Sequence, residues 1–224
     1  MFSIFRDADQ LENVEEQLDM MLNQGRRMFD LASDAIFGEQ EVDAVQEELW
    51  GLDKELNKTE RAIRRELMVH GTVRGAEVDQ GLMLAYMSVA KDMERIGDYC
   101  KNIWDLAHTG VRLGGHADTA VLKKHAAEVA RLLASGTEAF VNDDFDAVHD
   151  LIPSIQDNET QYDKLVHQYV VSDEVGSVAA SRALFFRYLK RISAHLSNVL
   201  SSVVMPVDRL DFYKESKAID AEED

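Results

Sequence analysis

Apolar residues recur along this chain in alternating steps of three and four positions, a spacing typical of α-helices with one buried face. In the first half, this pattern predicts three helices, roughly over residues 7–36, 39–70 and 76–110. The clearest stripe belongs to the third of them: Val89, Met93, Ile96, Cys100, Ile103 and Ala107. Gly38 marks the first turn, and Gly71 and Gly75 mark the second. Long helices joined by short turns predict an up-down bundle.

The second half of the chain repeats this pattern after Gly114 and Gly115 interrupt it. A shift of 96 positions carries the third-helix stripe onto another apolar stripe: Phe185, Leu189, Ile192, Leu196, Val199 and Val203. Any two helices of this kind can be slid into partial agreement. Local identities, such as Asn102 with Asn198, favour duplication over a chance register.

We therefore predict an all-α protein of two tandem homologous three-helix bundles, with six long antiparallel helices. The repeats would span residues 1–113 and 116–207, and a frayed acidic tail would follow over residues 208–224. Pro153 falls inside the fifth predicted helix, where it is expected to kink the helix or delay its start. Pro206 is expected to end the sixth.

Composition and charge narrow the class of protein and its partners. Acidic residues outnumber basic ones by 42 to 24, a net charge of −18, which disfavours nucleic acid and anionic lipid as partners. Cations and basic protein surfaces are favoured, although solubility or a saline habitat explains the acidity equally well. No apolar run is long enough to span a membrane, and the first residues lack the basic segment of a signal peptide. The single cysteine suits a reducing cytoplasm, where we expect the protein.

The segment KDMERIGDYCKNIWD, residues 91–105, holds the densest chemical signal. Glu94 and Asp98 are four positions apart, so both carboxylates leave one helix face, about 6 Å apart. Both point away from the buried stripe, as does Asp105. Carboxylates on a rigid helix suit hard or oxophilic cations, such as magnesium, manganese or iron. The alternative is a solvated acidic face, because lysine and arginine flank both residues.

Two acidic residues of the second predicted helix are candidates to complete this metal site. An antiparallel turn centred near Val73 would place Asp53 level with Glu94, and Glu48 level with Asp98. Gly97 stands between the two carboxylates at a helix-interior position, where glycine costs up to about 1 kcal/mol relative to alanine. Its presence suggests that another backbone or a bound group approaches closely.

The run ERIGDYCKNI, residues 94–103, within two three-helix repeats of this length, resembles the signature of the PhoU family. The resemblance covers most of the chain and implies a PhoU-like fold and a non-catalytic cytoplasmic regulator of phosphate uptake. It implies action on a phosphate ABC transporter, on a phosphate-sensing histidine kinase, or on both, by a signalling adaptor that forms a homodimer. It also implies a bound metal of unknown identity (iron, manganese, magnesium or zinc) on Glu94 and Asp98.

The second repeat departs from this signature. In KRISAHLSNV, residues 190–199, Lys190 replaces the acid and Ala194 replaces the aspartate, so we expect at most one metal site. His195 alone is a weak ligand candidate. Two other functions stay open: a carboxylate-metal enzyme or storage protein using iron or manganese, and a purely structural helical adaptor.

Overall fold

The computed structural model describes residues 11–75, 79–211 and 213. These residues form six α-helices and one short 3-10 helix, and no strand occurs among them. The helices are α1 (Glu12–Phe37), α2 (Val42–Arg74), α3 (Gln80–His108), α4 (Thr119–Val141), α5 (Phe145–Val170) and α6 (Gly176–Val204), followed by the 3-10 helix η3 (Val207–Arg209). The predicted all-α fold is confirmed. None of the helices in the described ranges has a stretch long and apolar enough to cross a bilayer.

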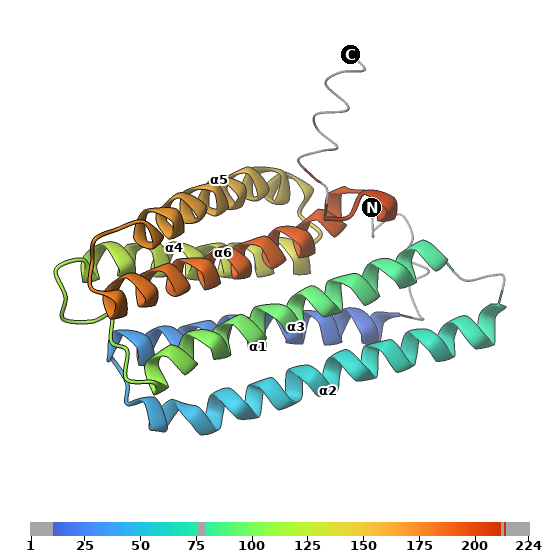
Figure 1. Cartoon of the computed structure of the whole chain (residues 1–224). Helices are drawn as coiled ribbons and strands as arrows, with labels where there is room; N and C mark the ends of the chain where they lie inside the picture. The colour runs from blue at the N-terminus through green and yellow to red at the C-terminus, as the bar shows by residue number, and fades with distance from the viewer. Residues whose placement is uncertain (1–10, 76–78, 212, 214–224) are drawn as a thin grey trace, which may run out of the picture.

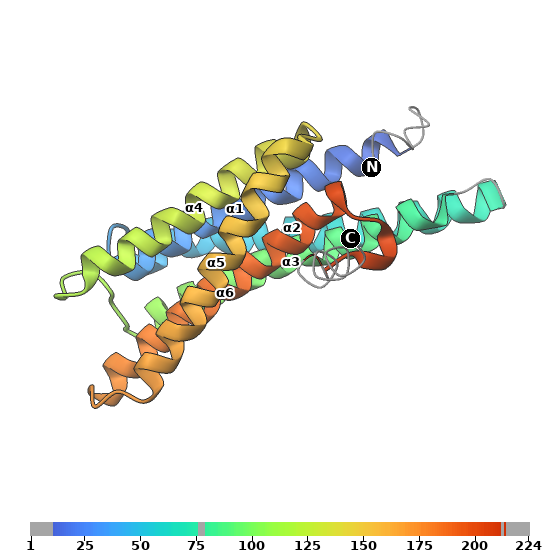
Figure 2. The same ribbon diagram turned by 90° about the horizontal axis from the view of Figure 1, so that it is seen from above.

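The helices form two layers, α1 to α3 in one and α4 to α6 in the other (Figure 1). The layers meet where α3 packs against α6 and where α1 packs against α4. Within the layers, α2 packs on α1 and α3, whereas α5 packs on α4 and α6 (Figure 2). As a result α2 lies on the outside of its layer, away from α4 to α6, and α3 lies between α2 and α6.

The predicted apolar stripes form one continuous core across all six helices. Both copies of the repeated stripe are buried, and every position of the α6 copy is at most 1% exposed: Phe185, Leu189, Ile192, Leu196, Val199 and Val203. Both stripes therefore face one shared core, whereas the duplication itself stays a prediction.

The turn between α2 and α3 lies further along the chain than the sequence suggested. Gly71 is inside α2, which continues to Arg74 and is capped by Gly75 with a positive φ of 57°. A glycine tolerates this left-handed conformation, so the helix can end there. A later turn moves every residue of α2 relative to α3, which changes the neighbours of the motif residues.

The two prolines of the chain lie at different places relative to their helices. Pro153 lies inside α5, which begins before it at Phe145, so the start of this helix is not delayed. Pro206 follows the end of α6, as expected. The predicted C-terminal tail begins differently: Leu210 and Tyr213 are buried, and the Asp211 backbone N–H donates to Ser201 Oγ at 3.3 Å. Residues 214–224 lie outside the described residues.

The connection between the two layers depends on a close backbone approach. The Leu113 N–H donates to the Ile36 carbonyl at 2.9 Å, which holds the linker against the end of α1. A Cβ atom on Gly114 would lie 2.1 Å from the Phe37 carbonyl oxygen. Only glycine fits at this position, so Gly114 is the residue that permits the passage from α3 into the second repeat.

Candidate functional site

Charged side chains of residues 91–105 form two ion-pair clusters where α3 faces α2. The first is centred on Glu94, whose Oε2 accepts from Lys91 Nζ at 2.6 Å. Lys91 also lies 3.9 Å from Glu60 of α2, which pairs with Arg64 at 2.7 Å. Glu94 is only 8% exposed, so the expectation that it points outward is wrong. A helix packed between two others buries more than one stripe, which the angle from the apolar stripe alone could not reveal.

The second cluster is centred on Lys101, which bridges the two helices. Its Nζ lies 2.7 Å from Asp53 Oδ1 and 3.2 Å from Asp98 Oδ1. Arg95 pairs with the other oxygen of Asp98 at 3.3 Å. Burial lowers the pKa of Lys101, but the hydrogen bonds to Asp53 and Asp98 outweigh this effect, and the pKa is raised. Lys101 is thus a firmly charged cation between the two carboxylates.

Of the four predicted metal ligands, Asp98 shares Lys101 with Asp53 and shares Arg95 with Glu94. Glu60, two helical turns beyond Asp53, faces Glu94 instead, because α2 ends later than predicted. Glu48 lies apart from both clusters, where it accepts two hydrogen bonds from Arg27 of α1 at 2.7 and 3.0 Å. The expected placement of Glu48 level with Asp98 is therefore wrong.

This arrangement does not suit a metal ion. Each of the four carboxylates forms an ion pair with lysine or arginine, and Lys101 occupies the space between Asp53 and Asp98. Within residues 11–75, 79–211 and 213, no group of three or more histidine, cysteine, aspartate or glutamate side chains is placed to hold a metal ion. Metal binding at Glu94, Asp98, Asp53 and Glu48 stays a prediction. A metal ion would have to displace the lysines and arginines that pair with these carboxylates.

Gly97 has a different role from the one expected. A Cβ atom on this residue would lie 2.8 Å from Leu56 Cδ2 and 3.2 Å from Met28 Sδ. The close neighbours are side chains of α2 and α1, not another backbone or a bound group. The glycine within the motif therefore serves the packing of three helices.

A pocket of about 330 Å³ opens beside the Lys101 cluster, between α2 and α3. Its lining combines two aromatic rings with four charged side chains and one amide: Trp50, Arg95, Asp98, Tyr99, Lys101, Asn102 and Asp105. Trp50 is 40% exposed and lies edge-on to the buried Trp104, with ring centroids 4.7 Å apart. Trp104 donates from Nε1 to the Val42 carbonyl at 3.0 Å, so the ring behind Trp50 is fixed in place.

Sequence reasoning missed a buried polar network on the opposite side of α3, where the helix contacts α6. Asp92 Oδ1 accepts from His195 Nδ1 at 2.6 Å and from Asn198 Nδ2 at 3.2 Å. Arg191 donates to Tyr99 Oη at 3.1 Å and lies 3.3 Å from His195 Nε2. Because arginine can only donate, the tautomer with the proton on Nδ1 satisfies both contacts of His195, with Nε2 accepting from Arg191 and Nδ1 donating to Asp92. His195 is thus a structural residue here; the available signal was its position beside the buried α6 stripe.

The α6 positions that match the motif offer no free carboxylate. Lys190 pairs with Asp163 of α5, and Ala194 offers no ligand atom. The α3 face carries acids where α6 carries a lysine and an alanine, which is the difference from which the asymmetry in metal binding was predicted. Whether either face takes a metal stays a prediction.

Substitution of Asp98 tests the predicted metal site directly. In Asp98→Ala, Lys101 keeps Asp53 as a partner, so we expect the free energy of unfolding to fall by only about 0.5 to 1 kcal/mol. If Glu94 and Asp98 hold a metal, the bound metal of the natively purified protein should disappear in this variant. Elemental analysis and urea unfolding of both proteins give the answer. Equal metal content in the two would exclude Asp98 as a ligand.

Comparisons with known proteins found a similar domain family and a similar fold. Residues 18–107, which include most of α1, all of α2 and nearly all of α3, match the family model described as the PhoU domain. Among solved structures, the crystal structure of PhoU from Pseudomonas aeruginosa is similar, with a TM-score of 0.74 and 20% sequence identity over 87% of this chain and 95% of that chain. No curated protein sequence matches the chain. Residues 18–107 are thus similar to the PhoU domain, and the resemblance to the PhoU family is confirmed over these residues.

Proposed function

We propose that this chain, whose residues 18–107 are similar to the PhoU domain, is a non-catalytic regulator of phosphate uptake that works by binding other proteins. The match over residues 18–107 is the observation that carries this proposal, because it covers the helices that present the motif. The partners we propose are a phosphate ABC transporter, a phosphate-sensing histidine kinase, or both. A helical signalling adaptor of this kind needs an accessible binding surface rather than a reaction centre.

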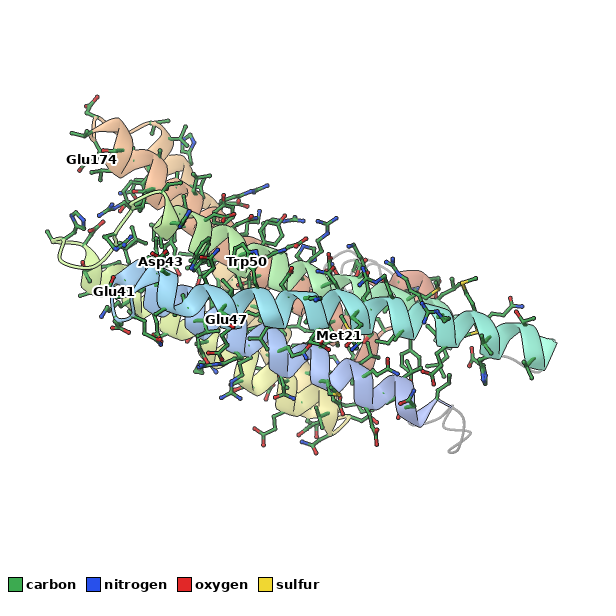
Figure 3. All side chains as sticks on the ribbon, turned by 90° about the horizontal axis from the view of Figure 1, so that it is seen from below. Met21, Glu41, Asp43, Glu47, Trp50 and Glu174 are labelled. Carbon is green, nitrogen blue, oxygen red and sulfur yellow. The ribbon has the colours of Figure 1, made fainter. Side chains whose placement is uncertain are left out.

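The outer helix α2 supplies such a surface. Its first half exposes Asp43, Glu47 and Trp50, and Glu41, which caps the start of the helix, is exposed as well; Figure 3 labels all four. Acidic side chains around an exposed tryptophan are typical of contacts with basic protein surfaces, since aromatic residues anchor interfaces and complementary charge speeds association. The net charge of −18 also attracts basic protein surfaces.

Affinity capture from the source cell tests the proposed function. We expect the tagged chain to recover a component of phosphate transport or phosphate sensing from cells grown with ample phosphate, from starved cells, or from both. A variant with Glu41, Asp43 and Glu47 all changed to lysine should lose that component, because the charge of the surface is reversed. Recovery of no such component by the unmodified chain under either condition would contradict the proposal.

Three further expectations belong to this proposal. A homodimer in the cytoplasm is expected, and light scattering together with cell fractionation would test it. A bound metal ion would have to displace the lysines and arginines that already pair with the motif carboxylates, and elemental analysis would detect it. If the purified protein holds iron or manganese and turns over dioxygen, a carboxylate-metal enzyme or storage protein would replace the regulator as the better interpretation.

A further inference from the structure

We propose that the pocket between α2 and α3 receives an arginine side chain from a basic segment of a partner protein. This inference rests on the proposed function, since it supposes that the chain binds a protein partner. It names the chemistry that the α2–α3 surface recognises: a guanidinium group that lies against Trp50 and pairs with Asp105.

The aromatic walls of the pocket are held firmly by their neighbours. Trp50 contacts the buried Trp104, and Tyr99 accepts a hydrogen bond from Arg191 at 3.1 Å. The Tyr99 ring also stacks on His195, with centroids 5.7 Å apart. A rigid wall lowers the entropic cost of binding, because few side chains must be ordered when a ligand enters.

The positive groups of the pocket are already neutralised. Lys101 lies between Asp53 and Asp98, and Arg95 pairs with Asp98 at 3.3 Å and lies 3.9 Å from Glu94. An incoming anion would have to compete with these carboxylates for each cation. The pocket therefore does not favour a phosphate group, although a lysine and an arginine line it.

The negative group that remains available is Asp105. It is exposed, and it makes no ion pair with any of the residues that the structure describes. Burial raises the pKa of the neighbouring Tyr188, and the charge of Asp105 adds to this rise. The negative charge of Asp105 thus raises the pKa of Tyr188 and is not neutralised by an ion pair with any described residue. An entering guanidinium would supply the neutralising positive charge.

Arginine suits this pocket better than lysine. A planar guanidinium stacks on an aromatic face and forms two parallel hydrogen bonds to a carboxylate, whereas an ammonium group is a point charge with a stronger hydration shell. Trp50 and Asp105 offer the aromatic ring and the carboxylate within one cavity, and the Asn102 amide on the same wall adds a hydrogen-bonding group. The exposed acidic residues that precede Trp50 at the start of α2 would hold further basic residues of the same segment (Figure 3).

The test uses the full chain and a short peptide of three arginines with blocked ends, at about 150 mM salt so that long-range attraction is screened. Nuclear magnetic resonance follows the indole N–H signals of the protein's 2 tryptophans. We expect the Trp50 signal to shift saturably and the Trp104 signal to change little. The Kd should rise about fivefold in Asp105→Asn, the loss expected for one ion pair of about 1 kcal/mol. Glu174→Gln removes the same charge at the distant α5–α6 turn and should leave the Kd unchanged (Figure 3).

Several results would overturn the inference. Equal weakening by Asp105→Asn and Glu174→Gln would show attraction by net charge alone. Equally tight binding of three lysines, or of three citrullines that keep the shape but lack the charge, would remove the role of guanidinium. A saturable shift of Trp50 by inorganic phosphate would make the pocket an anion site.

Failure of this inference is distinguishable from failure of the proposed function. If the arginine peptide does not bind while affinity capture still recovers a phosphate-transport or sensor component, the pocket assignment is wrong and the regulator stands. If the peptide binds at Trp50 but capture recovers no such component, the pocket stands and the proposed function is wrong.

Discussion

Replacement of Asp92 by alanine is expected to lower the free energy of unfolding by about 3 kcal/mol, because it removes one side of a buried polar pair. Asp92 is 9% exposed and His195 is 8% exposed. In the variant, His195 Nδ1 and the Asn198 amide would both lose the oxygen that accepts from them. Urea unfolding followed by circular dichroism measures the change.

The same pair joins the two layers, since Asp92 is on α3 and His195 is on α6. Asp92→Asn keeps an oxygen acceptor and should lose clearly less stability than Asp92→Ala. Asp105→Ala, on the exposed side of the same helix, should stay within about 0.5 kcal/mol of the unmodified protein. A loss below about 1 kcal/mol in Asp92→Ala would show that the pair contributes little to holding the layers together.

Replacement of Gly97 by valine is expected to cost about 3 kcal/mol, for a reason of packing rather than ligand binding. The end of the Leu56 side chain, 2.8 Å from the site of the new Cβ, can give way to a single methyl group. Valine adds two more carbons between Leu56 and Met28, where all three helices of the first repeat meet. Thermal and urea unfolding measure the effect.

Gly51 provides a matched control for this variant. It is also within a helix, but a Cβ atom there would meet no atom within 4 Å. Gly51→Val should therefore stay within about 0.5 kcal/mol of the unmodified protein. If Gly97→Val were equally harmless, the interpretation of Gly97 as a packing residue would be wrong, and its close approach to a ligand would need to be reconsidered.

Local pattern was sufficient to predict the helices and their buried faces. The spacing of apolar residues recurs with the period of a helix, and burial of that face dominates the free energy of folding, so the stripes on α3 and α6 are buried as expected. The run ERIGDYCKNI, within predicted helices of this length, indicated the PhoU family, because a motif is read from residue types and their order without knowledge of contacts.

The neighbours of the motif residues could not be predicted from the local sequence pattern. A few residues decide where α2 ends, and its continuation through Gly71 to Arg74 brings Glu60, not Asp53, opposite Glu94. Glu94 is buried because α3 has neighbours on two sides, which depends on how the layers stack.

The buried Asp92–His195 pair and the pocket are both products of tertiary structure. Asp92 and His195 meet although 103 positions separate them, and the pocket joins Trp50 of α2 to Asp105 of α3. Sequence periodicity determines which face of a helix is apolar, since it depends only on neighbours along the chain. It does not determine the rotation and register of one helix against another, because these follow from side-chain packing between segments far apart in the sequence.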